Sequence, residues 1–477
     1  MSDTSILWFR QDLRLSDLPA LKAAGSDDHK VLPVYILDDE AAGDWRPGAA
    51  SRWWLHHSLE ALAKSIDEKG GKLIFSRGDS AKLLKKLCKD SGAERVFCSR
   101  RYEPWAAEQE KTLHEALKDT DIELKRYPGS LLHEPGTVLT QNDDPYKVFT
   151  PFWRACRKES VADPISIPKV SWSDYKDSES LDDWDLLPSK PNWASEWLDY
   201  WTPGEEGAKN RLEEFLGDAV NRYAKDRDLP AVDGTSRLSP HLHHGELSPR
   251  QIYALCEQRK DEKPGSESAI EKFQAELGWR EFSYHLMHFF PHIPEKAFKE
   301  QFEDFPWQKK KSHLERWQQG NTGYPIVDAG MRELWATGYM HNRVRMVVAS
   351  FLCKHLLHHW RHGEDWFWDT LVDADLASNG AGWQWVAGSG ADAAPYFRIF
   401  NPMTQGEKFD KKGEYVRRWV PEIADLPDKH LHTPWEAPED VLEEAKVKLG
   451  DNYPQPIVDH KEARQAALDA YDEIKKS

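Results

Sequence analysis

The first 130 residues alternate short apolar runs with amphipathic stretches. The apolar runs predict buried strands at residues 6–9, 31–37, 73–75, 95–98 and 122–124. Apolar residues at helical spacing predict helices at 51–69, 80–90 and 104–118, capped by Ser51 and Ser80 and opened by Pro104. Strands that alternate with helices form a parallel, doubly wound sheet. We therefore expect a Rossmann-like α/β domain over residues 1–130.

The residue composition and the hydrophobic pattern of the chain change twice after this domain. From 131 to 205, Asp, Ser, Pro and Trp cluster, which is typical of a connector that lies over folded units. From 206 to 477 helical periodicity dominates, and residues 344–357 are apolar on most faces, as in a central buried helix. We predict an α/β domain (1–130), an interdomain connector (131–205) and a large all-α domain (206–477).

Parallel sheets of this kind bind ligands at the carboxyl ends of their strands. A dinucleotide-binding enzyme would have the glycine pattern GxGxxG after its first strand. Residues 11–14 (QDLR) stand there instead. The sequence therefore argues against an ordinary NAD-dependent enzyme.

Composition excludes two broad classes of protein. The chain of 477 residues is 39% hydrophobic and 30% charged without a long uncharged apolar run, so we expect no membrane span. Its first residues lack a basic segment followed by an apolar one, which argues against secretion. The five cysteines form no C-x-x-C pair, which argues against a disulfide framework. The cytoplasm, a reducing compartment, fits these features.

Charge and tryptophan content point in different directions. A net charge of -17 disfavours a nucleic-acid partner for the average surface, because phosphate binding needs Lys and Arg, but it does not exclude a local basic patch. The 22 tryptophans are roughly three to four times the usual number. Most would pack in the core, and some would serve as stacking platforms or redox relays.

Residues 233–248 contain the first candidate binding chemistry. A glycine is followed by Thr235, Ser236 and Arg237 just before helical sequence, which offers hydroxyls, backbone N–H groups and a guanidinium to a phosphate. A capped turn that leads into a helix explains the same residues. The histidines that follow have no Cys or carboxylate at an established ligand spacing. We expect no metal ion, and exposed or capping roles for His241, His243 and His244.

A second candidate lies on a predicted helix at 276–286. Glu276 and Arg280 flank Trp279 on neighbouring helical faces. This arrangement suits either a site that stacks a base and binds its edge or a packed helix with an i,i+4 ion pair.

A third candidate lies at the start of the predicted buried helix. Arg343 and Arg345 need acidic or anionic partners beside so apolar a helix. The nearest candidates by composition are Asp373 and Asp375 in the segment 371–385. That segment combines polar, small and aromatic residues, as expected of a segment that lines a pocket.

Several motifs along the chain resemble one known family. They are WFRQDLRLSD (8–17), TSRLS (235–239), WREF (279–282), TGYPIVDAGMR (322–332), MHNRVRM (340–346) and residues 373–385. In this order, from residue 5 to about 436, they resemble the photolyase/cryptochrome family. The nearest resemblance is to microbial cyclobutane pyrimidine dimer photolyases of class III, near the plant cryptochromes.

The resemblance implies an N-terminal α/β domain for an antenna chromophore and a helical domain that holds FAD in a U-shaped conformation. Asn379 would face flavin N5, where a neutral amide favours the anionic reduced flavin, FADH⁻, that repair needs. The implied FAD-binding residues are Tyr223, Thr235, Ser236, Arg237, Leu238, Ser239, Arg280, Asn342, Arg345, Asp373, Asp375 and Asn379.

The implied activity is light-driven DNA repair, in which excited FADH⁻ passes an electron to a flipped-out pyrimidine dimer, the dimer splits and the electron returns. Trp279 and Trp385 would sandwich the dimer, each stack contributing about 1–3 kcal/mol. The implied catalytic residues are Glu276, Asn342, Met346 and Asn379. The implied lesion or DNA contacts are Glu276, Trp279, Asn342, Arg343, Met346, Trp385, Arg398 and Gln405.

Asn342 and Met346 also discriminate between lesions. Relatives that repair (6-4) photoproducts have two histidines at these positions, because that chemistry needs proton transfer. Neither Asn nor Met acts as a general acid near neutral pH. Cyclobutane dimers are therefore the expected substrate.

The resemblance further implies an electron relay from flavin to surface, and the charged residues of the sequence itself suggest a basic patch for DNA. The relay residues are Trp383, Trp360 and Trp307. The patch would bind phosphates despite the acidic body of the protein. It comprises Arg343, Arg398, Lys408, Lys411, Lys412, Arg417 and Arg418.

Residues 45–52 and 100–105 resemble the antenna loops of class III proteins, so we expect 5,10-methenyltetrahydrofolate as antenna. The Asn-Glu pair of some folate-binding relatives is absent, which leaves a deazaflavin or an empty site as alternatives. The alternative function is a cryptochrome-like blue-light photoreceptor with the same flavin pocket; Asn379 and Met346 favour the enzyme. We expect a monomer that acts on UV-damaged DNA.

Overall fold

Two compact units make up the chain in the computed structural model, which describes residues 4–26, 29–393 and 397–475. Unit 1 comprises Met1–Asn221, Ser236–Pro291 and Val372–Ala377. Unit 2 comprises Arg222–Thr235, His292–Leu371 and Ser378–Ser477. Each unit has buried apolar clusters of its own. The boundaries expected at residues 130 and 205 stay a prediction.

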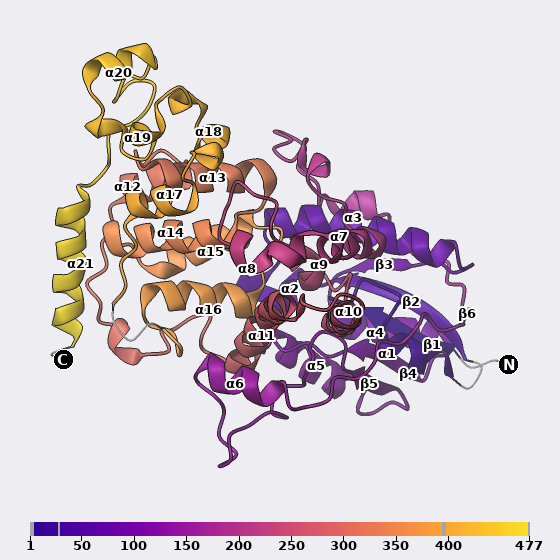
Figure 1. Cartoon of the computed structure of the whole chain (residues 1–477). Helices are drawn as coiled ribbons and strands as arrows, with labels where there is room; N and C mark the ends of the chain where they lie inside the picture. Colours follow the sequence, from indigo (N-terminus) through magenta and orange to yellow (C-terminus); the bar gives the residue numbers. More distant parts are fainter. Residues whose placement is uncertain (1–3, 27–28, 394–396, 476–477) are drawn as a thin grey trace. The chain divides into compact units, whose positions relative to one another are not determined.

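Unit 1 contains a six-stranded parallel sheet of order β3-β2-β1-β4-β5, with β6 paired to β2 (Figure 1). The strands are β1 (Thr4–Phe9), β2 (Lys30–Leu37), β3 (Ile74–Arg77), β4 (Arg95–Ser99), β5 (Glu123–Tyr127) and β6 (Ser171–Trp172). The helices of this α/β part are α1 (Pro19–Ala24), α2 (Asp39–Ala42), α3 (Ala49–Asp67), α4 (Ser80–Ser91) and α5 (Pro104–Leu117).

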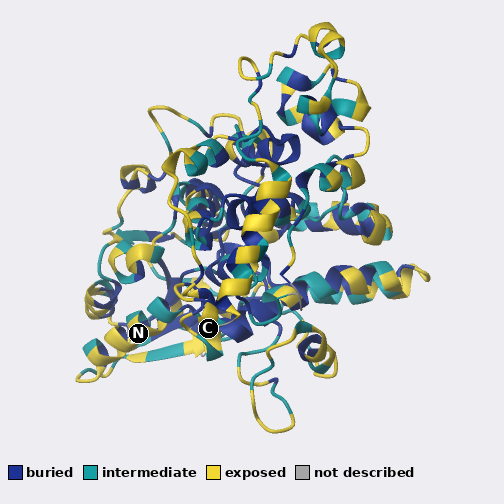
Figure 2. Ribbon diagram, turned by 90° about the vertical axis from the view of Figure 1, so that its left-hand side faces the viewer, coloured by how far each residue is buried: buried dark blue, intermediate teal, exposed yellow. Residues whose placement is uncertain are grey.

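Both faces of the sheet are covered by helices. Leu7 and Phe9 of β1 pack in one cluster with α1 and α3, whereas Ile6 and Trp8 pack in a second cluster with α4 and α5. This alternation follows from the two-residue period of a strand. Figure 2 shows helices whose buried residues lie on one face and whose exposed residues lie on the other. The predicted doubly wound α/β fold is confirmed.

Two of the predicted helix caps are wrong. Helix α3 begins at Ala49, so Ser51 lies inside it. Helix α4 is capped by Asp79, whose carboxylate accepts a hydrogen bond from the N–H of Lys82 at 3.0 Å. A carboxylate at this end of a helix also interacts favourably with the helix dipole. Pro104 does open α5, as predicted.

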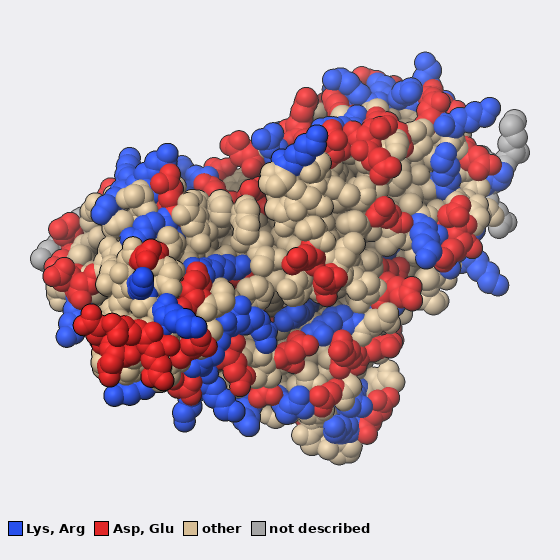
Figure 3. All heavy atoms as spheres, turned by 90° about the horizontal axis from the view of Figure 1, so that it is seen from above, with Lys and Arg blue, Asp and Glu red and all other residues tan. Residues whose placement is uncertain are grey.

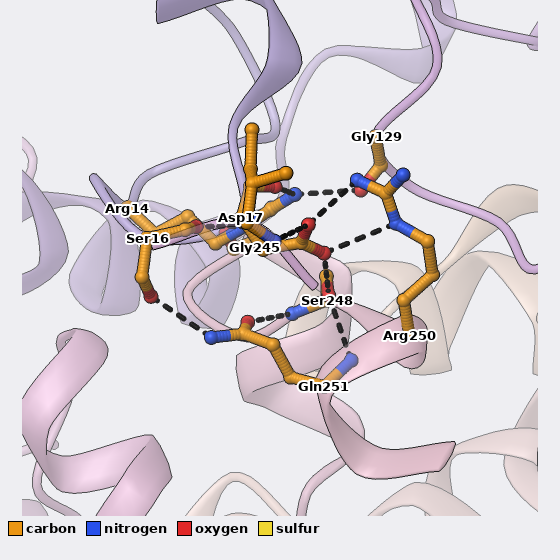
Figure 4. Close-up of polar contacts among 9 residues, drawn as sticks. Arg14, Ser16, Asp17, Gly129, Gly245, Ser248, Arg250 and Gln251 are labelled. Atoms are coloured by element: carbon orange, nitrogen blue, oxygen red, sulfur yellow. Dashed lines mark hydrogen bonds and ion pairs between the residues drawn. The ribbon is translucent and has the colours of Figure 1, made fainter. Parts of the chain in front are cut away.

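A buried polar network joins the loop after β1 to a helix of unit 1 (Figure 4). Arg14 donates to the carbonyl of Gly245 at 2.8 Å, and Asp17 accepts from Arg250 at 2.8 and 3.1 Å. Ser248 caps that helix and donates to Asp17. Arg14, one of the residues that replace the dinucleotide glycine pattern, thus binds the turn before this helix, and Asp17 binds the helix itself. The helix that Ser248 caps is α10 (Pro249–Glu262). The other helices of unit 1 that follow the α/β part are α6 (Phe149–Cys156), α7 (Glu205–Gly217), α9 (Ser239–His243) and α11 (Glu267–Phe289).

Unit 2 is built of helices. The predicted buried helix at 344–357 is α14 (Asn342–Ser350), which continues into a π-helical turn at Phe351–His355. The other helices are α8 (Tyr223–Asp226), α12 (Lys311–Gln318), α13 (Pro325–Thr337), α15 (Trp360–Thr370), α17 (Pro402–Phe409), α18 (Glu414–Trp419), α19 (Asp428–Leu431), α20 (Glu439–Glu444) and α21 (His460–Ile474). Helix α16 (Leu376–Ala387) has its first two residues in unit 1. Within the described ranges, no helix is long and apolar enough to span a bilayer.

Candidate functional site

The turn before α9 has an unusual backbone. Arg237 adopts a left-handed conformation with φ of 50°, which is uncommon for a residue with a side chain. In unit 2, Gly234 lies so close to α8 that a Cβ on it would be 2.8 Å from the Cβ of Asp226. In unit 1, the hydroxyl of Ser239 donates to Asp373 at 2.5 Å. The predicted turn is present, and its hydroxyl is oriented by a carboxylate.

Asp375 is buried in unit 1 among polar partners. The hydroxyl of Tyr284 donates to its Oδ2 at 2.5 Å, and Nδ1 of His243 lies 3.7 Å from the same oxygen. Burial alone would raise the pKa of Asp375, but His243, Arg280 and Tyr284 outweigh it and hold this pKa well below its usual range. Asp375 therefore remains a carboxylate, suited to accept hydrogen bonds from a ligand.

The histidines before α10 are buried, so the expectation that they are exposed is wrong, while His244 does occupy the C-cap position of α9. His241 hydrogen-bonds Glu246, and His244 stacks on Trp54 with ring centroids 5.9 Å apart. Burial lowers the pKa of His244 well below its ordinary value. These partners include a residue of α3, far away in the sequence, so local spacing did not reveal them.

One cluster in the described part of the chain has three metal-ligand atoms within 4.8 Å of one another, from His56, His57 and Glu60. Glu60 already hydrogen-bonds Nδ1 of His57 at 2.9 Å. The expectation that the protein binds no metal ion stays a prediction.

Trp279 lies on α11 and is 36% exposed. Its indole stacks on the ring of Phe149 from α6, with centroids 3.7 Å apart and planes 9° apart. Glu276 is half-buried one turn earlier. One face of the indole is therefore covered by a residue that the sequence did not single out, because Phe149 stands 130 positions away in the predicted connector.

Arg343 lies in the first turn of α14 in unit 2 and pairs with Asp228 at 2.9 Å. The expectation that its partner lies in the segment 371–385 is wrong: the partner comes from the short segment after α8. Arg345 donates to the carbonyl of Met340 at 2.7 Å, and its pairing with Asp373 or Asp375 stays a prediction. The other lesion or DNA contacts expected in unit 2 are at least partly exposed: Asn342, Met346, Trp385, Arg398 and Gln405.

Asn379 lies on α16 and donates its Nδ2 to the backbone carbonyl of Glu364 at 3.1 Å. The side chain of Glu364 is fully buried, and its two oxygens have no hydrogen-bond partner among the described residues. Burial raises the pKa of Glu364 well above its ordinary value. The structure therefore places Asn379 beside the backbone of a residue whose burial disfavours ionisation of its carboxyl group.

The predicted relay tryptophans all belong to unit 2. Trp383 and Trp360 are buried, whereas Trp307 is half-exposed. The His359 ring has its centroid 5.1 Å from that of Trp307 and 5.4 Å from that of Trp360. A Cβ on Gly363 would lie 2.0 Å from the Trp383 ring. The indole therefore fits at this place because residue 363 has no side chain. Of the three indoles, that of Trp307 is the one that is partly exposed, as the surface end of a relay requires.

The residues of the predicted basic patch differ in what they contact. Arg417 pairs with Asp428 at 2.8 Å and donates to the carbonyls of Ala424 and Leu426, so its guanidinium is held internally. On the face shown in Figure 3, basic side chains are interspersed with acidic ones. The exposed members of the patch are Arg398, Lys408, Lys411, Lys412 and Arg418.

Comparison with known proteins places the whole chain in one family. A model described as the FAD binding domain of DNA photolyase matches residues 273–473, and one described as DNA photolyase matches residues 5–169. The deoxyribodipyrimidine photo-lyase of Agrobacterium fabrum is 50% identical over 479 residues, 99% of this chain and 98% of that protein. The chain belongs to the photolyase/cryptochrome family.

Members of both branches of the photolyase/cryptochrome family are similar to it. A class III photolyase from Agrobacterium tumefaciens, solved by crystallography, matches with a TM-score of 0.96 at 49% identity, covering 100% of this chain and 98% of that one. Cryptochrome-2 of Arabidopsis thaliana is 36% identical over 98% of this chain and 78% of its own length. The expected fold and FAD-binding domain are confirmed, while the roles of single residues stay predictions.

Proposed function

We propose that this protein is a light-driven DNA-repair lyase that splits cyclobutane pyrimidine dimers. The observation that supports it most is the end-to-end match at 50% identity to a deoxyribodipyrimidine photo-lyase. Asn342 and Met346 also favour this lesion, because neither side chain donates the proton that (6-4) repair needs.

The proposed cofactor is FAD, reduced to FADH⁻ in its active form. When bound, it supplies upon excitation the electron that splits the dimer and takes that electron back. The donor set fits a flavin dinucleotide: the left-handed turn at Arg237 supplies hydroxyls and a guanidinium for phosphates, and Asp373 and Asp375 are buried carboxylates for hydroxyl donors. The residues proposed to hold it are Tyr223, Thr235, Ser236, Arg237, Leu238, Ser239, Arg280, Asn342, Arg345, Asp373, Asp375 and Asn379.

Asn379 would set the hydrogen bonding at flavin N5. Its Nδ2 is held by the carbonyl of Glu364, so the amide presents its oxygen, which is an acceptor. A neutral acceptor neither adds charge nor supplies a proton. This property supports an anionic reduced flavin as the working state.

Binding of the lesion would depend on stacking and hydrogen bonding by this chain. Trp279 and Trp385 would stack on the two bases, at about 1–3 kcal/mol each. Glu276 and Asn342 would bind the base edges, and Met346 would pack beside them. Arg343, Arg398 and Gln405 would contact the DNA around the lesion.

We propose 5,10-methenyltetrahydrofolate as the antenna, close to residues 45–52 and 100–105. Arg10, Arg100 and Arg101 line a cavity at the carboxyl ends of β1 and β4, but each of these guanidiniums is paired with a glutamate (Glu110, Glu134 and Glu103), so the proposal rests on the resemblance of the loops. The test is the absorption spectrum of the purified protein. A folate band that disappears after denaturation and filtration supports the proposal, whereas a deazaflavin band or the flavin spectrum alone contradicts it.

We propose that the protein works as a monomer in the cytoplasm. All five cysteines are free and buried, which fits a reducing compartment. Sedimentation velocity of the purified protein tests the oligomeric state, and a dimer at micromolar concentration would contradict it.

The decisive experiment uses the reduced, FAD-loaded protein and an oligonucleotide with one thymine dimer. We expect loss of the dimer under blue light and none in darkness, measured by chromatography of the products. An oligonucleotide with a (6-4) photoproduct is the matched control and should stay unrepaired. A dimer that persists under light, despite bound reduced flavin, would favour the photoreceptor function.

A further inference from the structure

Helices α6 and α11 of unit 1 pack at very close range. A Cβ on Gly278 would lie 2.6 Å from the ring of Trp153, so α6 approaches α11 where α11 has no side chain. Phe152 packs beside it against Phe282 and His285, with centroids 5.3 and 4.8 Å apart. These contacts fix the position of α6 on α11.

Polar contacts bind the segment before α6 to the same helix. Glu281 of α11 accepts from the N–H groups of Leu132 and His133 at 3.0 and 3.1 Å. Arg280 donates to the carbonyl of Ser130 at 2.6 Å. The first residues of the predicted connector are thus held to α11.

Phe149 is the first residue of α6, one turn before Phe152, and its ring covers one face of Trp279. With centroids 3.7 Å and planes 9° apart, the two rings overlap almost fully. Phe282 contacts both rings edge-on, at 6.0 Å from each. The indole is therefore fixed in its plane although it is 36% exposed.

We propose that Phe149 is a positioning residue for lesion binding: its stack on Trp279 fixes the plane of the indole and leaves one face for a damaged base. This inference rests on the proposed function, in which Trp279 stacks on the dimer. An exposed side chain that samples several rotamers loses that freedom when a ligand binds, and an indole held in advance does not. The preorganised ring should strengthen lesion binding about three- to tenfold.

The experiment compares F149L, which lacks a flat ring, with F149Y, which keeps one. Phe289→Leu is the matched control, because Phe289 lies on α11 in the same region and its ring contacts His285 and His288. For each FAD-loaded variant, Kd is measured in the dark for a duplex with one thymine dimer and for the undamaged duplex. KM and kcat for repair under blue light are measured as well.

We expect F149L to raise Kd for the damaged duplex and KM about three- to tenfold, with kcat and the Kd for undamaged duplex unchanged. F149Y and F289L should behave as the wild type. In a Trp279→Ala background, F149L should have no further effect, because the two rings act as one unit. If F149L does not fold, Phe149→Met, of similar volume without a ring, replaces it.

Three results would overturn the inference. One is a normal affinity of F149L for damaged DNA while W279A weakens it. Another is an equal loss of affinity for damaged and undamaged DNA. The third is that F149L weakens lesion binding as much in the W279A background as it does alone. If W279A itself leaves lesion affinity unchanged, the proposed lesion site is wrong and this inference falls with it.

Discussion

The carboxylate of Asp17 accepts two hydrogen bonds from the guanidinium of Arg250, at 2.8 and 3.1 Å. Asp17 follows β1 and is fully buried, whereas Arg250 belongs to α10. Arg14 lies in the same network, and burial lowers its pKa although nearby carboxylates oppose the change. Buried charges of this kind are tolerated only with their partners in place. The pair therefore joins the sheet of unit 1 to its helices.

We predict that Asp17→Asn destabilises the protein by about 3–5 kcal/mol, because it leaves the buried guanidinium of Arg250 without its counter-charge. The measurement is the shift in urea midpoint followed by far-UV circular dichroism. Asp428→Asn is the control: Asp428 pairs with Arg417 but is 62% exposed, so little change is expected. Equal shifts for the two variants would contradict the structural role of Asp17.

The second prediction concerns Glu281, a buried carboxyl on α11. Burial raises its pKa to about 7, although Arg280 and two backbone N–H groups oppose the change. A raised pKa in the folded state favours folding at low pH, so this stabilisation is present below about pH 4.5 and is lost as pH rises to about 7. The Glu281→Gln side chain cannot ionise. The free energy of unfolding of this variant should therefore exceed that of the wild type by up to about 3 kcal/mol between pH 5 and 8.

Urea midpoints at pH 5, 6, 7 and 8 test this prediction. Glu271→Gln is the matched control on the same helix, because Glu271 is 45% exposed and pairs with Arg157. The difference in urea midpoint between E271Q and the wild type should hardly depend on pH. Parallel pH profiles for E281Q and the wild type would show that Glu281 is ionised in the folded protein across this range.

The parts of the fold that follow from local periodicity were predictable from sequence. The five strands and three helices predicted for the α/β part lie within a few residues of the observed ones because their buried faces repeat every two or 3.6 residues, whereas the short helices α1 and α2 were not predicted. Strand β6, Ser171–Trp172, is too short to have a period and was missed. The π-helical turn at Phe351–His355 was also missed, since a stretch that is apolar on most faces does not reveal its hydrogen-bonding register.

Contacts between distant segments were not predictable in the candidate site. Arg343 was expected to need an anionic partner, and it has one, but Asp228 lies 115 positions away. Trp279 was singled out by its neighbours on the helix, whereas Phe149 beneath it belongs to another segment. Sequence identifies which side chains need a partner, and the tertiary fold decides which partner each receives.

The third prediction concerns salt. Binding of duplex DNA releases counterions, so the slope of log K against log salt should fall in magnitude by about 0.9 for each lost phosphate contact. Lys411→Ala should lose one such contact, because Lys411 is an exposed member of the proposed basic patch. Arg417→Ala should leave the slope unchanged, since Arg417 is held by Asp428 and backbone carbonyls. Binding curves at salt concentrations from about 50 to 200 mM measure this slope. Identical slopes for the wild type and K411A would exclude Lys411 from the DNA-binding surface.

The fourth prediction separates the electron relay from repair by means of two glycines. A Cβ on Gly363 would lie 2.0 Å from the ring of Trp383, whereas one on Gly382 would meet nothing within 4 Å. Gly363→Ala must therefore displace Trp383, at a cost of about 1–3 kcal/mol, and should slow light-driven flavin reduction several-fold, because electron transfer weakens steeply with distance. Gly382→Ala is the same substitution beside the same tryptophan, and it should stabilise α16 by up to about 1 kcal/mol without changing that rate. Both variants should repair dimers normally once their flavin is reduced chemically, because the relay only regenerates the reduced state. If folded G363A photoreduces at the wild-type rate, Trp383 is not on the path that the electron takes.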